Sequence, residues 1–153
     1  MDKEMLHQEL NMIHDCIKRM AFNSFMLKGW YVSLVFLGAN IINGKILDYL
    51  LVSMLLLILT LVFWCLDAFF LKMETLYRWK YEWVIKDRLK GNVADFYDLN
   101  PYNYNEWINP CDKMSKIHFT NYVFSKTLIP LYGFGIVVPI SYILFDLIKR
   151  LCF

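Results

Sequence analysis

Residues 50–64 read LLVSMLLLILTLVFW, a nearly unbroken run of apolar side chains. With its flanks the apolar stretch covers residues 46–71, more than the roughly 20 residues that a helix needs to cross a bilayer. No Gly or Pro follows before Gly91, so the helical pattern continues through residues 72–90. We therefore predict an all-α integral membrane protein with a transmembrane segment at 46–71 and a cytoplasmic helical extension at 72–90.

Two segments precede this stretch. Residues 1–20 carry apolar side chains at helical spacing, which predicts an amphipathic cytoplasmic helix that packs on a partner helix or lies on the membrane surface. Residues 21–42 are apolar but contain polar residues, Lys28 among them, and we predict that they form the first transmembrane segment. The sequence Asn43-Gly44-Lys45 is typical of a tight turn, so the first two segments should form a transmembrane hairpin.

Residues 91–121 differ in composition and are predicted to form a cytoplasmic loop. The part at 91–111 contains two prolines and five asparagines and shows no aliphatic periodicity. Its many aromatic side chains indicate a loop that packs against other parts of the protein.

A last apolar stretch at residues 122–147 is long enough to cross the membrane. Pro130 and Pro139 remove helical hydrogen bonds, which membrane helices tolerate where neighbouring helices satisfy the freed carbonyls. We predict a kinked third transmembrane segment, with a re-entrant hairpin as the alternative. The G-x-G pattern of Gly133 and Gly135 indicates close helix packing within the membrane.

The distribution of basic residues predicts the orientation. Of the 16 Lys and Arg residues, 13 lie before the first span, near its start or between the second and third spans, and three lie elsewhere: Lys45, Lys149 and Arg150. The positive-inside rule then places the N-terminus in the cytoplasm and, with three spans, the C-terminus outside. A re-entrant hairpin would return the C-terminus to the cytoplasm.

Composition argues against several functional classes. The net charge of +2 gives little support to nucleic-acid binding, and the four cysteines form no C-x-x-C pair. The three histidines are scattered, no phosphate-binding loop or nucleophile motif occurs, and 58% of the residues are hydrophobic. We therefore expect neither an enzyme nor a protein with a cofactor or metal, but one whose first partner is the lipid bilayer.

Two ionisable residues fall inside predicted spans, Lys28 in the first and Asp67 in the second. Such a group costs about 2.5–3.5 kcal/mol on insertion scales and is a functional candidate. If the two helices of the hairpin are antiparallel and Gly44 is the midpoint between them, Asp67 lies at the same depth as Ala21, near Arg19 on the first helix.

Two interpretations follow from this placement. In the functional one, polar side chains form a seam that lines a water-filled path, within the hairpin or between subunits. The members of this polar seam are Lys28, Asn23, Asp67, Arg19, Glu74 and Arg78. In the structural one, a buried Asp67–Arg19 pair fixes the helix register, and Lys28 extends to the membrane interface.

Three motifs carry a family resemblance. They are residues 19–30 (RMAFNSFMLKGW), residues 63–78 with the pattern F-W-x-L-D-A-x-x-L-x-x-E-x-x-x-R, and residues 125–133 with S-K-T-L-x-x-x-Y-G. Together they span nearly the whole chain, which resembles a family of small, mostly uncharacterised bacterial inner-membrane proteins with an R-M-A-x-N-S-F-x-L-K-G-W signature. In architecture the chain is also similar to the SLATT-type anti-phage transmembrane effectors.

These observations support two functional hypotheses. The first is a small effector that forms homo-oligomers and permeabilises or depolarises the inner membrane in antiviral defence, triggered by a soluble sensor partner or a signal. The second is a structural or adaptor membrane anchor that recruits a soluble partner through its cytoplasmic region. We favour the first hypothesis, because of the charges within the predicted spans, the small size of the chain, its long cytoplasmic helix and the architectural similarity, and we keep the second as the alternative.

Overall fold

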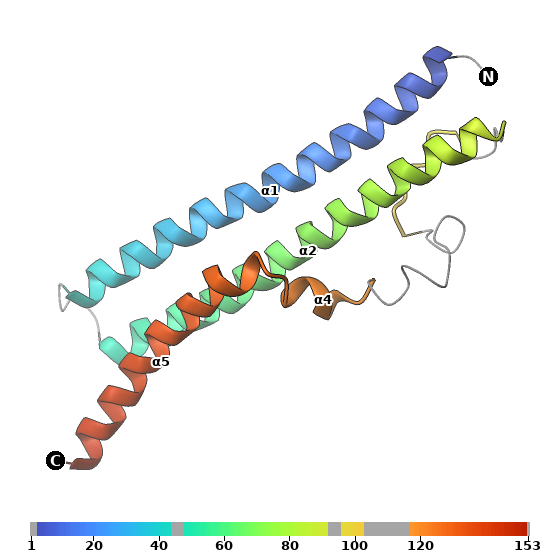
Figure 1. Cartoon of the computed structure of the whole chain (residues 1–153). Helices are drawn as coiled ribbons and strands as arrows, with labels where there is room; N and C mark the ends of the chain where they lie inside the picture. The colour runs from blue at the N-terminus through green and yellow to red at the C-terminus, as the bar shows by residue number, and fades with distance from the viewer. Residues whose placement is uncertain (1–2, 44–47, 92–95, 103–116, 153) are drawn as a thin grey trace. The chain divides into compact units, whose positions relative to one another are not determined.

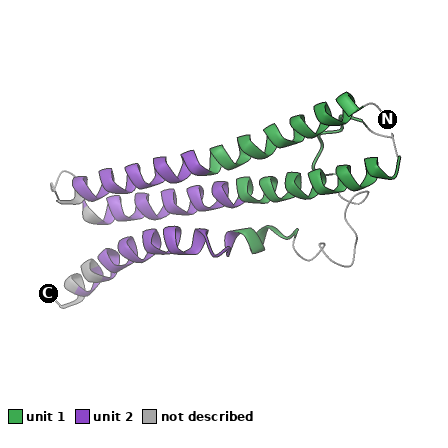
Figure 2. Ribbon diagram, turned by 45° about the horizontal axis from the view of Figure 1, so that its top comes forward, with its two compact units in different colours: residues 1–24, 69–122 green, residues 25–68, 123–153 purple. Residues whose placement is uncertain are grey.

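The computed structural model describes residues 3–43, 48–91, 96–102 and 117–152, with the backbone alone at 42–43, 49, 145–146 and 149–152. Within these residues the regular secondary structure is α-helical throughout (Figure 1). The helices are α1 (Lys3–Asn43), α2 (Tyr49–Leu89), α4 (Phe119–Val123) and α5 (Leu128–Cys152). The chain divides into two compact units (Figure 2): unit 1 comprises residues 1–24 and 69–122, and unit 2 comprises residues 25–68 and 123–153.

Helices α1 and α2 are each 41 residues long. Helix α1 joins the predicted amphipathic helix at 1–20 and the predicted span at 21–42 without a break, because this stretch contains no proline and no turn sequence. Helix α2 likewise joins the predicted span and its extension. It ends before Gly91, whose φ of 84° suits glycine at a helix C-terminus. Of the predicted turn, Asn43 ends α1, and Gly44 and Lys45 lie outside the described residues.

The C-terminal part differs in detail from the prediction. The short helix α4 lies where the end of the 91–121 loop and the start of the third span were expected, and α5 begins only at Leu128. The backbone amides of Leu128 and Ile129 bond the Ser125 carbonyl, which starts the new helix at this point. Residues 92–95 and 103–116 of the predicted loop at 91–121 lie outside the described residues.

Helix α5 is continuous through both prolines. Pro130 falls in its first turn, where the backbone amides have no partner within the helix, and Pro139 lies in its interior. Because residues 128–152 form one helix without a reversal of direction, the re-entrant hairpin does not describe them.

Unit 1 has an ordinary apolar core between the N-terminal part of α1 and the C-terminal part of α2. Its buried members are Ile13, Cys16, Ile17, Met73, Leu76, Tyr77 and Val84. The apolar stripe predicted for residues 1–20 therefore packs on a partner helix.

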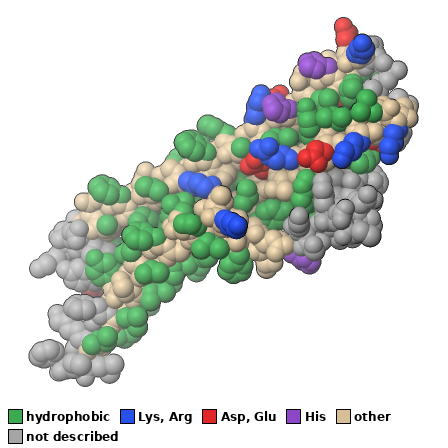
Figure 3. Space-filling view, in the orientation of Figure 1, with side chains coloured by type: hydrophobic (Ala, Val, Ile, Leu, Met, Phe, Trp, Pro, Cys, Tyr) green, Lys and Arg blue, Asp and Glu red, His purple; other side chains and the backbone are tan. Residues whose placement is uncertain are grey.

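Unit 2 differs: Val52, Leu128 and Tyr132 are buried in it, but several polar side chains are buried beside them and many large apolar ones lie outside. Ser53, Thr60 and Asp67 are at most 1% exposed, whereas Phe25 and Phe36 are more than 70% exposed. On the face shown in Figure 3, charged side chains gather over unit 1 and hydrophobic ones cover much of unit 2. Exposed apolar surface of this kind is typical of sites that contact another protein or a membrane.

Two helices are long and apolar enough to cross a membrane, over Lys3–Ile41 and Leu50–Leu89. Only 11% and 17% of their most apolar windows are buried inside the protein. The core helix of a soluble protein would be mostly buried, so the exposure favours contact with lipid. In α5 the apolar run at Leu128–Leu144 is shorter.

Candidate functional site

An ion pair between α1 and α2 is the centre of unit 2. The Lys28 ammonium lies 2.7 Å from Oδ2 and 2.9 Å from Oδ1 of Asp67. Asp67 is fully buried, and the Lys28 side chain is 33% exposed. A lone charge in an apolar region is costly, so each residue removes the cost of leaving the other unpaired.

A third helix contributes to the same carboxylate. The Tyr132 hydroxyl of α5 donates a hydrogen bond to Asp67 Oδ2 at 3.0 Å, and Tyr132 is fully buried. Both oxygens of Asp67 are therefore engaged, and one side chain ties three helices of unit 2 together. We call Lys28, Asp67 and Tyr132 the charged triad.

A second polar group lies in the same unit and explains how α5 accommodates Pro139. Without an N–H, Pro139 leaves the carbonyl of Gly135, four residues earlier, without its helical donor. The Thr60 hydroxyl lies 3.4 Å from this carbonyl and 2.7 Å from its own helix's Leu56 carbonyl. The Tyr31 hydroxyl is 3.2 Å from Thr60 Oγ1. When Tyr31 donates to Thr60, the Thr60 proton remains available to either carbonyl.

This group requires a glycine at position 135. A Cβ built on Gly135 would lie 1.6 Å from the Tyr31 hydroxyl oxygen, whereas one on Gly133 would meet nothing within 4 Å. Of the two glycines expected to permit close packing, Gly135 therefore does so by direct contact. The Tyr31 and Tyr132 rings, 4.8 Å apart, link this group to the charged triad.

Trp64, on α2, holds the start of the C-terminal part of unit 2. Trp64 Nε1 donates to the Val123 carbonyl at 2.8 Å. Its ring stacks on Tyr132 with a centroid separation of 6.1 Å and an interplanar angle of 11°. The aromatic ring thus positions the tyrosine whose hydroxyl reaches Asp67.

The six residues of the predicted polar seam are divided between the units. Lys28 and Asp67 belong to unit 2, and the other four belong to unit 1. Glu74 and Arg78 form an exposed ion pair at 2.7 Å, Arg19 donates to the Cys16 sulfur at 3.8 Å, and Asn23 is half-buried on α1.

The expected Asp67–Arg19 pair is wrong, since Lys28 holds the carboxylate. The prediction paired the two antiparallel helices around a residue that lies too early in the chain. Helix α1 ends at Asn43 and α2 begins at Tyr49, so the midpoint between the helices is residue 46 and not Gly44. Asp67 then lies level with residue 25, and the long Lys28 side chain spans the remaining turn. Sequence reasoning missed Tyr132, whose only signal was its position in the S-K-T-L-x-x-x-Y-G motif.

Unit 1 contains a separate pair, between Glu9 of α1 and Arg88 of α2. The Arg88 guanidinium binds both Glu9 oxygens, at 2.9 and 3.0 Å, and both side chains are at most 3% exposed. The Tyr97 amide donates to Glu9 at 3.3 Å, and the Phe96 ring lies 4.3 Å from Arg88 Cζ. A bidentate pair with these added contacts meets the conditions under which buried charges are tolerated.

Lys80 fixes the segment at 96–102 to α2. Its ammonium, 2% exposed, donates to Asp98 Oδ2 and to the Asn100 carbonyl, each at 2.8 Å. Burial raises the pKa of Asp98, but the hydrogen bonds from Lys80 and the Asn100 amide lower the pKa by more, so it falls below its ordinary value. The carboxylate is therefore the form that holds the segment.

Among the described residues, no three His, Cys, Asp or Glu side chains come together to hold a metal. No protein-family model, curated protein or solved structure matches the chain. Its function is therefore argued from the geometry of the two units.

Proposed function

We propose that the chain is a structural or adaptor membrane anchor, which inserts unit 2 into the inner membrane and carries unit 1 on the cytoplasmic side. One observation carries the proposal: Lys28 and Asp67 neutralise each other inside unit 2. With both Asp67 oxygens engaged, the charges act as a lock between three helices and require no water-filled path.

The surface of unit 2 supports insertion. Its outward side chains include Phe25, Trp30, Phe36 and Ile58, each more than half exposed. In water such a surface would drive aggregation, whereas in lipid it is the surface expected of a membrane-embedded helical unit. We place the N-terminus in the cytoplasm from the distribution of basic residues.

The surface of unit 1 supports a platform for a soluble partner. The buried Glu9–Arg88 and Lys80–Asp98 pairs hold the segment at 96–102 against the two helices. This leaves Tyr97 and Tyr102 37% and 53% exposed. Fixed, exposed tyrosines are frequent at protein interfaces because they contribute a large contact area at little entropic cost.

A second candidate is the oligomeric effector that depolarises the membrane, for which one observation speaks. An apolar replacement would join the helices at least as well as a buried ion pair, so a charged lock suits a part that opens. In this function a soluble sensor or signal acts on unit 1, the triad separates, and Lys28 and Asp67 of several copies line a path.

Cysteine labelling tests the anchor. In a chain whose native cysteines are replaced, a single cysteine at Leu89, 78% exposed in unit 1, should react in spheroplasts only after permeabilisation. A cysteine at Phe36, 72% exposed in unit 2, should stay unreactive until detergent is added. Rapid labelling at position 36 in intact membranes would contradict insertion.

A voltage-sensitive dye separates the two candidates. The anchor predicts that cells expressing the wild type and the neutral pair Lys28→Met with Asp67→Leu keep the same membrane potential. The effector predicts depolarisation by the wild type that this double variant abolishes and the exposed-pair control Arg78→Met retains. Depolarisation of that kind would replace the anchor with the effector.

A further inference from the structure

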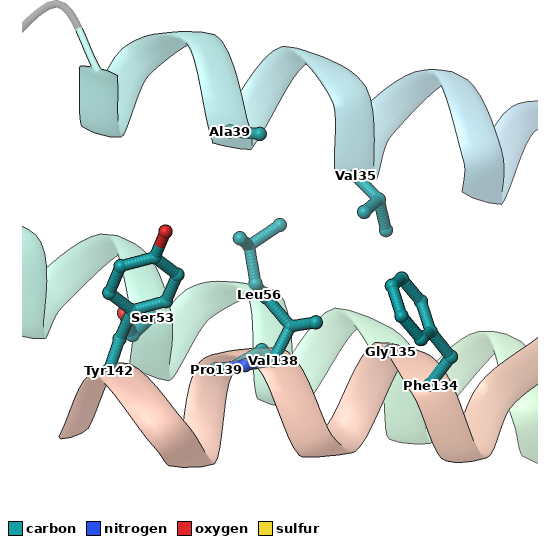
Figure 4. A pocket seen from close by; sticks show the side chains of 9 residues that line it. All are labelled: Val35, Ala39, Ser53, Leu56, Phe134, Gly135, Val138, Pro139 and Tyr142. Carbon is teal, nitrogen blue, oxygen red and sulfur yellow. The ribbon is translucent and has the colours of Figure 1, made fainter. Parts of the chain in front are cut away.

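Unit 2 contains an apolar cavity of about 210 Å³ between α1, α2 and α5 (Figure 4). Val35 and Ala39 line it from α1, Ser53 and Leu56 from α2, and Val138 and Tyr142 from α5. An apolar cavity of about 150 Å³ binds benzene, so this one has room for a comparable apolar group. It is separate from the charged triad, none of whose members lines it.

Ser53 places a buried polar group in the cavity wall. Ser53 is 1% exposed, and its hydroxyl finds no hydrogen-bond partner among the described residues. A buried hydroxyl without a partner costs about 1–3 kcal/mol, so it calls for an explanation, and a bound molecule is one. The hydroxyl of Tyr142 lies on the same wall (Figure 4), so the cavity fits an apolar chain that carries a hydrogen-bonding oxygen.

The depth of Ser53 identifies a source of such a chain. Asp48 is exposed and ionisable, which places it among the lipid headgroups or in water. Ser53 lies five residues farther along, about 7 Å along a helix axis. The headgroup region of each leaflet is about 5–7 Å thick, so Ser53 would lie where the ester groups meet the hydrocarbon.

We propose that unit 2 binds the acyl chain of a bilayer phospholipid in the apolar cavity, with the Ser53 hydroxyl donating to the ester carbonyl. The proposal combines the apolar lining, the Ser53 hydroxyl, which has no partner among the described residues, and the depth of Ser53. The chain lies against Val35, Ala39 and Val138 and excludes water from the group of Tyr31, Thr60 and Gly135, of which Gly135 also lines the cavity. This inference rests on the proposed insertion of unit 2 in the membrane.

Photocrosslinking tests the proposal with the full chain in vesicles of phosphatidylcholine and phosphatidylglycerol. The probe is a phosphatidylcholine with a diazirine near the ester end of one acyl chain, and mass spectrometry locates the label. We expect label at Ala39 and Val138 to exceed that at Phe36 and Leu55, which are 72% and 57% exposed but do not line the cavity.

Two variants, a control variant and an ether-linked lipid test the individual contacts between the cavity and the acyl chain. Ser53→Ala should lower the cavity label about fivefold, the equivalent of one neutral hydrogen bond of about 1 kcal/mol. The control Ser33→Ala, whose hydroxyl bonds the Gly29 carbonyl on the exposed side of α1, should leave the label unchanged. Ala39→Phe should fill the cavity and remove the label. An ether-linked probe, which lacks the carbonyl, should match Ser53→Ala without any change to the protein.

Four results would overturn the inference or the insertion on which it rests. Equal label at cavity and reference sites means ordinary lipid contact, and equal label by ester and ether probes removes the role of Ser53. Label at Phe36 and Leu55 without label in the cavity means that something else fills it, such as a second copy of the chain. Absence of label from all four positions would overturn the membrane insertion itself, so the failures of the two proposals are distinguishable.

Discussion

In each unit an ion pair with a buried carboxylate joins helices α1 and α2, and the two pairs differ in chemistry. In unit 1 the planar guanidinium of Arg88 binds Glu9 in a bidentate manner and also meets an aromatic ring. In unit 2 the single ammonium of Lys28 binds Asp67, and the Tyr132 hydroxyl from a third helix donates a hydrogen bond to the same carboxylate. The fork of an arginine fixes two helices by itself, whereas the point charge of a lysine needs a third partner to fix the geometry.

The difference matches what surrounds each pair. Unit 1 has an apolar core that already holds its helices together. Its Glu9–Arg88 pair fixes the register between α1 and α2, and Glu9 also accepts a hydrogen bond from the backbone amide of Tyr97. Unit 2 has many of its large apolar side chains outside, so polar contacts contribute to the specific attachment between its helices. In lipid, helix association depends on such packing and hydrogen bonds because hydrophobic burial contributes little.

The largest effect should follow from Arg88→Met. This change leaves the Glu9 carboxylate buried without its partner and should lower the free energy of unfolding by about 3–5 kcal/mol. Thermal unfolding in detergent measures the loss. The matched control Arg78→Met breaks an exposed pair and should cost less than about 1 kcal/mol. Equal losses in both variants would show that the unit 1 pair is not specially protected from solvent.

Gly135→Ala should have the next largest effect. The new methyl group would collide with the Tyr31 hydroxyl and displace it from Thr60, at a cost of about 1–3 kcal/mol. Gly133→Ala is the control, with open space at its Cβ position, and should be neutral or slightly stabilising because alanine favours helices. Thermal unfolding of the two variants compares them directly, and a stable Gly135→Ala protein would remove the close approach of α1 and α5 from the account.

Tyr132→Phe should cost about 1 kcal/mol, in the range measured for side-chain hydrogen bonds between membrane helices. It removes one donor from Asp67 but keeps the ring that stacks on Trp64. Tyr81→Phe, at a tyrosine of unit 1 outside the triad and the cavity, serves as the control. Should both variants unfold at the wild-type temperature, the third member of the triad would be dispensable.

The smallest effect concerns pH and unit 1 alone. Because the pKa of Asp98 is lowered on folding, its stabilising contribution is present above the unfolded pKa of about 4 and is lost as pH falls through the folded pKa. Solvent screening of a side chain that is 37% exposed limits this contribution to less than about 1 kcal/mol. Stability of the wild type between pH 5 and pH 2 should therefore fall slightly more than that of Asp98→Asn. Identical pH profiles would contradict the role of the carboxylate.

The helices themselves were predictable because their signals are local. The apolar run at 50–64 and the absence of Gly and Pro up to Gly91 are sufficient to predict α2. The break at residues 124–127, between α4 and α5, was missed because these residues include neither Gly nor Pro. Apolar composition alone does not show where one helix stops and the next begins.

The site was only partly predictable. A charge inside an apolar stretch is visible in the sequence, so Lys28 and Asp67 were found. Their pairing depended on the length of the α1–α2 connection, and an error of two residues in its midpoint assigned Asp67 to Arg19. Tyr31, Thr60 and Tyr132 were missed because tyrosine and threonine are common in membrane helices, and only the spatial arrangement shows what they contact.

Lys28 and Asp67 bind each other within one chain. A double-mutant cycle would test this pairing. We would measure thermal unfolding in detergent for Lys28→Met, Asp67→Asn and the double variant. We expect each single change to cost about 2.5–3.5 kcal/mol and the double change to cost far less than their sum. Single effects that add without coupling would contradict the pair and return both residues to a water-filled seam.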